Sequence, residues 1–267
     1  MPLLSPSYIQ AIRAILPKNN VIDDISRRRA YATDASFYQL IPQLILKVSS
    51  IPQMQAILKC SQTHGVNVTF RAAGTSLSGQ AVSDSVLLLL DEHWRGHEIL
   101  NDGQQIRLQP GVIGAQANQY LAPYHRKIGP DPASINTCKI GGIAANNASG
   151  MCCGVANNTF YTLAGMTIIL ADGTAVNTQD PQSVAAFSSS HADLLKNLAQ
   201  LGLDVRNDQV LSDLIAHKYR LKNTTGYSIN ALTDFTDPID ILVHLMVGSE
   251  GTLGFIADIT YNTVVDY

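Results

Sequence analysis

Three short glycine-rich segments constrain this chain more than any other feature of its sequence. They read RAAGTSLSGQ (71–80), GPDPASINTCKIGGIAANNASG (129–150) and VGSEGTLG (247–254). Each lies where a predicted strand ends or begins, and glycine there permits positive φ and a close approach of the main chain to a ligand. Successive backbone N–H groups in such a loop can surround an anion. Any one segment could be only a tight turn, but three together favour a site for a phosphate-bearing cofactor.

The same segments do not match the two best-known phosphate-binding loops. Gly74 and Gly79 have the spacing of a Walker A loop, but Gln80 and Ala81 stand where Lys and Ser or Thr are required. The pattern G-x-G-x-x-G, which marks Rossmann dinucleotide sites, does not occur. The cofactor is therefore expected in a different kind of phosphate-binding loop.

Composition and charge narrow the possible function classes. The 267 residues are 46% hydrophobic and 15% charged, which excludes a disordered chain. A net charge of −3 without a basic stripe gives no support for a nucleic-acid partner. The longest apolar stretches fall far short of the ~20 residues of a membrane-spanning helix. The four cysteines form no C-x-x-C pair and no signal-peptide pattern is present, so we expect reduced thiols in a cytoplasmic protein.

Hydrophobic periodicity predicts a mixed α and β chain. Helices are expected at 5–16, 23–32, 50–64, 114–120, 191–201 and 208–218, and strands at 44–48, 66–70, 85–90 and 255–264. Asp102-Gly103 and Asp172-Gly173 each predict a hairpin. Because two hairpins interrupt the alternation of strands and helices, a uniform βαβ repeat is not expected.

The three segments and their flanking strands resemble the flavin-contacting segments of a known domain, the FAD-binding (PCMH-type) domain of the vanillyl-alcohol-oxidase superfamily. The matching stretches are FRAAGTSLSGQAVSDSVLLLLD, GPDPASINTCKIGGIAANNASG and VGSEGTLGFIADIT, in the family's order. The branch that they most resemble holds the D-lactate, glycolate and D-2-hydroxyglutarate dehydrogenases, including large bacterial members with an iron–sulfur domain. The resemblance runs from about Tyr31 to the last strand. It implies an α+β, two-lobed PCMH-type domain over residues 1–267, with lobe one at about 1–110 and lobe two at about 111–267.

The resemblance also implies which residues contact FAD. Main-chain amides of the first segment would surround the pyrophosphate, with help from the Thr75 and Ser76 hydroxyls. The second segment would lie beside the isoalloxazine ring and continue along the ribityl chain and the adenosine half, and the third would close the pocket. Tyr227, in KNTTGYSIN (222–230), matches a family segment near the flavin. The candidate cofactor-binding residues are Arg71, Ala72, Ala73, Gly74, Thr75, Ser76, Gly79, Gln80, Pro130, Asp131, Ser134, Cys138, Ile140, Gly141, Gly142, Asn146, Ser149, Gly150, Glu250, Gly251 and Ile256.

Some positions depart from the family pattern. Ala72 and Ala73 replace glycines that are common in the first loop, so positive φ is less favourable there. Thr75 stands where covalent-flavin relatives place a histidine, so FAD is expected to be held non-covalently. The Arg-Tyr-Gly that often follows the second segment is absent, and MCCGVANN occupies its neighbourhood.

Other groups with possible chemistry have simpler interpretations. His93 and His97 have the i, i+4 spacing of metal ligands, but no third ligand can be assigned, so a polar surface turn is favoured and no metal site is predicted. Cys152 and Cys153 could be a redox pair near the flavin, although small buried residues in a tight segment explain them as well. The run Arg27–Arg29 could attract an anionic substrate, but a short basic run is usually a solvated helix face.

In the family that the chain resembles, a hydroxy-acid substrate gives a hydride to the flavin while a base removes the hydroxyl proton. The resemblance thus implies the FAD-binding domain of an FAD-dependent D-2-hydroxy-acid dehydrogenase, with D-lactate the leading substrate. D-2-hydroxyglutarate, glycolate, and a flavin-binding module without activity of its own are the alternatives. Electrons would pass to a quinone, a cytochrome or an iron–sulfur domain, in a full-length protein that could lie on the inner membrane face.

The substrate clamp and the histidine-rich metal cluster of these relatives belong to a cap domain that follows the FAD domain. None of the seven histidines lies in a motif that matches this cluster. We therefore expect the cap domain to be absent from this chain and the fragment alone to be inactive, and we assign no catalytic residue.

Overall fold

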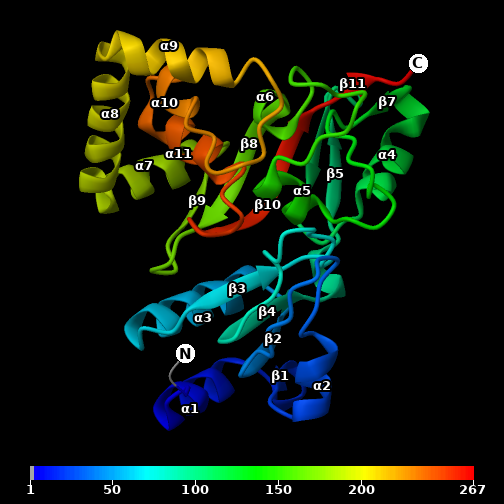
Figure 1. The fold of residues 1–267 in the computed structure, drawn as a ribbon, viewed down its shortest axis with the longest axis vertical. Coiled ribbons are helices and arrows are strands. Elements are labelled where there is room, and N and C mark those ends of the chain that lie inside the picture. Colours follow the sequence, from blue (N-terminus) through cyan, green and yellow to red (C-terminus); the bar gives the residue numbers. More distant parts are fainter. Residues whose placement is uncertain (1–2) are drawn as a thin grey trace.

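Two β-sheets, each covered by its own helices, form two lobes in the computed structural model, which describes residues 3–267 (Figure 1). The first sheet uses strands from the N-terminal third of the chain, and the second uses strands from the rest. The architecture is therefore the α+β, two-lobed fold that the sequence predicts.

The first lobe contains a mostly parallel sheet. β2 and β3 both run parallel to the central strand β4, and the short β1 pairs antiparallel with β2. β2 and β4 have nearly continuous apolar sequences, LILKV and VLLLL, because helices and loops cover both faces of the sheet. In sheet order the strands are β1 (Val21–Ile22), β2 (Leu44–Val48), β4 (Val86–Leu90) and β3 (Val68–Arg71), and the helices are α1 (Pro6–Ile15), α2 (Ile25–Ala30) and α3 (Ile51–Thr63).

Capping residues set the helix starts in this lobe. The Ser5 hydroxyl accepts a hydrogen bond from the Tyr8 amide (3.2 Å), and Ser50 begins α3 in the same way. Both helices were expected at these positions. α2 begins later than expected, because Asp24 rather than Asp23 is its cap.

The second lobe contains an antiparallel sheet with β10 between β6 and β8. Both predicted hairpins are present, as β5–β6 and β8–β9. The β5–β6 hairpin pairs with β10, so the boundary between the sheets falls before His97 rather than at about residue 110, where the lobes were expected to divide. In sheet order the strands are β5 (His97–Leu100), β6 (Gln105–Leu108), β10 (Phe255–Asn262), β8 (Leu163–Ile169) and β9 (Ala175–Asn177).

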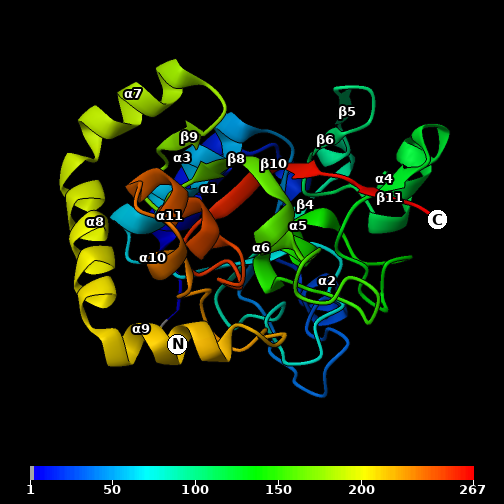
Figure 2. The same ribbon diagram turned by 90° about the horizontal axis from the view of Figure 1, so that it is seen from above.

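Helices pack against this second sheet and extend beyond it. α7, α8 and α9 form an outer frame around α10 and α11 (Figure 2). α7 and α11 were not expected from the sequence, and α8 is longer than predicted. Within residues 3–267, no helix has both the length and the apolar character needed to cross a membrane. The helices are α4 (Gly114–Leu121), α5 (Ile140–Asn146), α6 (Thr159–Thr162), α7 (Pro181–Ser190), α8 (Ala192–Asn207), α9 (Gln209–Lys218), α10 (Ala231–Asp234) and α11 (Pro238–Met246), and a small ribbon pairs β7 (Arg126–Lys127) with β11 (Val264–Val265).

Aromatic side chains join the two lobes. Phe255, at the start of β10, lies with its ring centroid 5.3 Å from that of Phe70 and 5.2 Å from that of Trp94. Trp94 is almost fully buried, and its indole N–H donates to the Val48 carbonyl (2.8 Å). The second sheet is thereby packed against the ends of β2 and β3.

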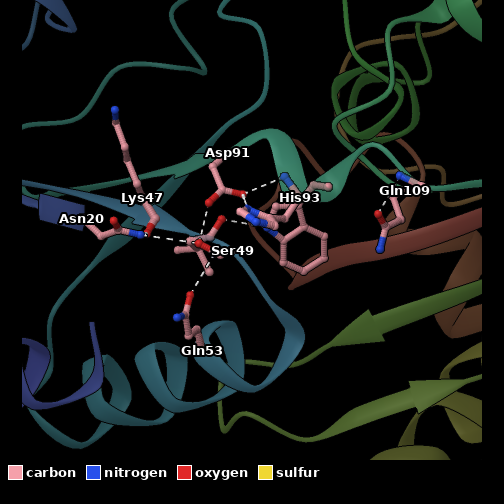
Figure 3. A network of polar contacts seen from close by, with 10 residues as sticks. Asn20, Lys47, Ser49, Gln53, Asp91, His93 and Gln109 are labelled. Atoms are coloured by element: carbon pink, nitrogen blue, oxygen red, sulfur yellow. Dashed lines mark hydrogen bonds and ion pairs between the residues drawn. The ribbon is translucent and has the colours of Figure 1, made fainter. Parts of the chain in front are cut away.

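A polar network holds the same ends of the first sheet in place (Figure 3). The Asp91 carboxylate accepts hydrogen bonds from the Ser49 hydroxyl and from the His93 amide. Gln53 in turn accepts from the Ser49 amide (2.9 Å). These contacts fix the segments that follow β2 and β4, next to the junction of the lobes.

Candidate functional site

The glycine-rich segments meet at a cavity of about 680 Å³ between the lobes. Its wall consists of the end of β3 and the loop after it, and of parts of segments 132–149 and 250–256. Single residues complete the wall: Ala35, Leu90, Pro110, Lys222 and Thr224. The volume lies within the roughly 300–1,000 Å³ of typical small-molecule sites.

Most of the residues that the sequence predicts for cofactor binding lie in this wall. They come from all three segments, which are far apart along the chain. The predicted residues that line the cavity are Arg71, Ala72, Ala73, Gly74, Thr75, Ser76, Gln80, Ser134, Cys138, Gly141, Gly142, Asn146, Ser149, Glu250, Gly251 and Ile256.

Two of the predicted residues outside the wall, Asp131 and Gly150, hold a loop in shape. The Asp131 carboxylate accepts from the amides of Gly150 (2.9 Å) and Cys153 (3.2 Å). Partial burial alone would raise the pKa of Asp131, but these hydrogen bonds outweigh it and the pKa lies below its ordinary value. Cys153 is buried in this turn, whereas Cys152 is exposed. The residues outside the wall are Gly79, Pro130, Asp131, Ile140 and Gly150.

The Arg71 side chain holds the first glycine-rich loop, residues 71–80, in place. Its guanidinium donates to the carbonyls of Thr33 (2.8 Å), Tyr31 (3.3 Å) and Ala81 (3.3 Å). Gly74 crosses over this group at φ +73°, and a Cβ there would lie 2.5 Å from the guanidinium. The Arg71 charge thus shapes the loop, and the loop's main chain faces the cavity.

The donors around the cavity suit a phosphate-bearing cofactor. Among the described residues, the main-chain amides of 73–77 donate no hydrogen bond to another part of the chain. Consecutive N–H groups of this kind can bind a pyrophosphate. The Ser149 hydroxyl is buried in the opposite wall and likewise has no partner among residues 3–267. Since a buried polar group without a partner is costly, this hydroxyl indicates a missing ligand.

Small residues line both sides of the narrow space where the first loop faces α5. A Cβ added to Gly142 would lie 3.7 Å from the Ala72 Cβ, which is an ordinary van der Waals contact. Apolar side chains of Ile143, Phe255 and Ile256 line the cavity beyond this point. The space therefore has both the polar loop and the apolar wall that a flavin nucleotide requires.

Glu250 links all three glycine-rich segments. Its carboxylate oxygen Oε1 accepts from Asn146 Nδ2 (2.5 Å) in the second segment and from Gln80 Nε2 (3.5 Å) in the first. Its amide donates to the Ala145 carbonyl (2.8 Å), and its φ of +54° is rare for a residue with a Cβ. Burial raises the pKa of Glu250 above its ordinary value, although the Asn146 hydrogen bond opposes this shift. Glu250 thus connects the lobes at the cavity.

The candidate residues leave out five polar residues of the wall: Ser78, Thr137, Lys139, Lys222 and Thr224. Burial lowers the pKa of Lys139, and the nearby Arg95 adds to this effect. Lys222 and Thr224 belong to KNTTGYSIN, the segment that was connected with the flavin through Tyr227. Tyr227 is not in the wall, and its hydroxyl lies 2.8 Å from the Thr252 hydroxyl.

His93 and His97 do not share a helical face. His93 lies in a 3₁₀ turn, while His97 starts β5 and stacks on Tyr120. Within the described part of the chain, no group of three or more His, Cys, Asp or Glu side chains is arranged to hold a metal ion.

Comparison with known proteins connects this cavity to a family. The family model described as "FAD binding domain" matches residues 42–179, just over half of the chain. D-2-hydroxyglutarate dehydrogenase of Haemophilus influenzae is 25% identical across 97% of this chain and 26% of its own length. Glycolate oxidase subunit GlcD of Escherichia coli K12 is 32% identical over 64% of this chain and 35% of that protein. The chain thus spans about a quarter to a third of these curated relatives.

Solved structures show the same fold. An alkyldihydroxyacetonephosphate synthase superposes on 99% of this chain with a TM-score of 0.64 at 14% identity, covering 42% of that protein. A chitooligosaccharide oxidase superposes on 96% of the chain and 43% of its own, with a TM-score of 0.60 at 16% identity. With its fold, its cavity and the matching family model, the chain belongs to the family of PCMH-type FAD-binding domains, and its cofactor is FAD.

Proposed function

We propose that this chain is the FAD-binding part of a dehydrogenase that oxidises a 2-hydroxy acid. The observation that carries the proposal is the convergence of three glycine-rich segments on one interlobe cavity. The names of the similar proteins support the substrate class, since they include D-2-hydroxyglutarate dehydrogenase, a glycolate oxidase subunit and D-lactate dehydrogenase. All three compounds are 2-hydroxy acids.

The chemistry that bound FAD supplies is acceptance of a hydride from the carbon that bears the hydroxyl, while the hydroxyl proton goes to a base and the acid becomes a 2-oxo acid. The two electrons would leave to a quinone, a cytochrome or an iron–sulfur domain.

The chain's own residues bind and orient the cofactor. The amides of 73–77 would donate to the pyrophosphate, and the Ser149 hydroxyl would gain a partner on the cofactor. Glu250, through Asn146 and Gln80, holds the walls of both lobes at a fixed separation. Ile143 and Ile256 exclude water from the apolar part of the cavity. No covalent link is proposed, since the first loop contains no histidine.

The proposal is tested by cofactor binding and by a chimera. The purified chain is titrated with FAD, and quenching of flavin fluorescence is expected. Residues 3–267 then replace the matching part of the Haemophilus influenzae relative, and D-2-hydroxyglutarate, D-lactate and glycolate are added without oxygen. We expect at least one acid to bleach the flavin absorbance band of the chimera.

Two results would contradict the proposal. One is the absence of any FAD binding by the folded chain. The other is a folded, FAD-loaded chimera whose flavin none of the three acids reduces, which would favour a flavin-binding module without hydroxy-acid turnover.

A further inference from the structure

We propose that Lys222 and Ser149 form an anion-binding subsite of the cavity, which takes a phosphate of FAD or the carboxylate of the substrate. Both residues line the cavity, and the Lys222 ammonium donates to the Ser149 carbonyl. The phosphate alternative rests on the FAD cofactor, and the carboxylate alternative rests on the proposed function.

The loop that carries Lys222, residues 219–230 between α9 and α10, is anchored at several points. The Ser228 hydroxyl donates to the Val247 carbonyl (2.7 Å), and the Tyr227 hydroxyl contacts that of Thr252 (2.8 Å). Within the loop, the Tyr219 hydroxyl donates to the Tyr227 carbonyl (2.7 Å). These contacts tie the loop to the third glycine-rich segment, and they bring Lys222, which is itself exposed, to the wall of the cavity.

The charges of the cavity leave Lys222 available for an anion. Arg71, Lys139, Lys222 and Glu250 are the charged residues of the wall. The Arg71 guanidinium is engaged with three backbone carbonyls, and Glu250 is engaged with Asn146 and Gln80. An ammonium group has three N–H donors, and the Ser149 carbonyl uses one of those on Lys222. The other two can donate to an anionic oxygen.

Ser149 supplies the independent observation that this subsite expects a ligand. The residue is only 6% exposed, and its hydroxyl has no partner among residues 3–267. Its carbonyl already holds Lys222, so the hydroxyl and the ammonium lie on the same short stretch of wall. Together they offer neutral and charged donors, the combination that phosphate and carboxylate oxygens accept.

The experiment compares ligand binding by the full chain and four variants. Lys222→Met removes the charge, Lys222→Arg keeps it, Ser149→Ala removes the hydroxyl, and Lys196→Met is the matched control on the exposed surface of α8. FAD and riboflavin affinities are measured by flavin fluorescence. Oxalate and D-lactate are then added to FAD-loaded chimeras that carry the same substitutions, and the change in the flavin spectrum is followed. Thermal unfolding confirms that each variant is folded.

For a phosphate ligand, Lys222→Met is expected to weaken FAD roughly tenfold to a hundredfold and to leave riboflavin unchanged. For a carboxylate ligand, FAD affinity is unchanged and the oxalate or D-lactate response weakens by the same factor. In either case Lys222→Arg keeps most of the binding affinity. Ser149→Ala lowers the affinity for the same ligand but does not lower thermal stability, because it removes an unpartnered buried group.

Equal FAD, oxalate and D-lactate responses in Lys222→Met and the unaltered chain would overturn the subsite. A loss that Lys196→Met reproduces would overturn it as well. Failure of the proposed function is distinguishable, because the three acids decide that function on the unaltered chimera, while the comparison of FAD with riboflavin decides the role of Lys222 on the chain itself.

Discussion

Gly142 and Ala72 illustrate at the residue scale how the chain reserves space for its cofactor. Both lie in the cavity wall and face each other across the two lobes. A Cβ at position 142 would not clash with Ala72, so the protein's own packing does not require glycine there. Gly142 lies inside α5 with ordinary helical φ, where alanine would be more favourable by about 0.5–1 kcal/mol. We therefore expect the missing side chain to leave room for the ligand.

The first prediction follows from this contrast. Gly142→Ala should leave the unfolding temperature of the FAD-free chain unchanged or raised, while FAD affinity falls roughly tenfold or more because a methyl group enters the space between the loops. Differential scanning fluorimetry and a flavin fluorescence titration measure the two effects. A variant that binds FAD as tightly as the unaltered chain would show that the cofactor lies elsewhere.

The second prediction concerns the pH dependence of Glu250. Since its folded-state pKa lies above the ordinary value of 4.5, the folded chain binds the proton more tightly than the unfolded chain. The contribution of Glu250 to the free energy of unfolding is therefore largest at low pH and falls as pH rises from about 4.5 through the raised pKa. Glu250→Gln removes this dependence and keeps an oxygen that can accept from Asn146 and Gln80.

Urea unfolding of the FAD-free chain and of Glu250→Gln over a pH series measures this difference. The unaltered chain should lose stability relative to the variant as pH rises through the window. Parallel curves would mean that the Glu250 carboxylate is as well solvated in the folded chain as in the unfolded one.

At the scale of elements, the sequence predicts a helix or strand best where its hydrophobic pattern matches the faces that are buried in the fold. β2 and β4 were expected because a parallel strand that is covered on both faces is apolar throughout. α11 was missed because PIDILVHLM is a nearly continuous apolar run, and a short run of this kind does not distinguish a buried helix from a buried strand. Its start is nevertheless signalled by Asp237 and the proline after it.

The candidate site likewise contains residues that could be predicted from the sequence and residues that could not. The glycine-rich loops could be predicted because the backbone conformations that favour glycine depend on the local sequence. Lys222 could not, because its position at the cavity depends on a contact with Ser149, 73 residues away in the chain. Glu250 was included in the predicted site, but its link to Gln80 spans 170 residues and is visible only in the folded structure.

The third prediction concerns the N-cap of α11, the helix that leads into the last glycine-rich segment. The Asp237 carboxylate accepts from the amides of Ile239 (2.7 Å) and Asp240 (3.3 Å). Asp237→Ala should lower the free energy of unfolding by about 1 kcal/mol, and Asp237→Asn should recover most of it because its side-chain oxygen can still cap the helix. Urea denaturation gives both values, and equal losses in the two variants would argue against capping.

At the scale of the whole molecule, one aromatic cluster packs the two lobes against each other. Phe255 is 4% exposed, contacts Phe70 and Trp94 of the first lobe, and lines the cavity. Trp94 is the only tryptophan of the chain, so its fluorescence reports on this junction.

The fourth prediction is that Phe255→Ala destabilises the chain by about 3–5 kcal/mol, because it removes a large buried ring that both lobes share. Tryptophan emission of the folded variant should shift to longer wavelength as the indole becomes more hydrated, and FAD affinity should fall. Phe255→Leu, which fills more of the space, should show smaller changes. Unaltered emission in Phe255→Ala would mean that the junction closes without this ring.

The central place of β10 in the second sheet has a consequence for biosynthesis. β10 is the last of that sheet's strands to leave the ribosome, yet it lies between β6 and β8 and carries the ring that joins the lobes. Until it emerges, the nascent chain can hold only two separate hairpins next to a finished first sheet, and the pairing of β10 with β6 closes a loop of some 150 residues. Cofactor capture should therefore wait until β10 has emerged and paired, and the unpaired edges of β6 and β8 are where a chaperone would protect the chain in the interval.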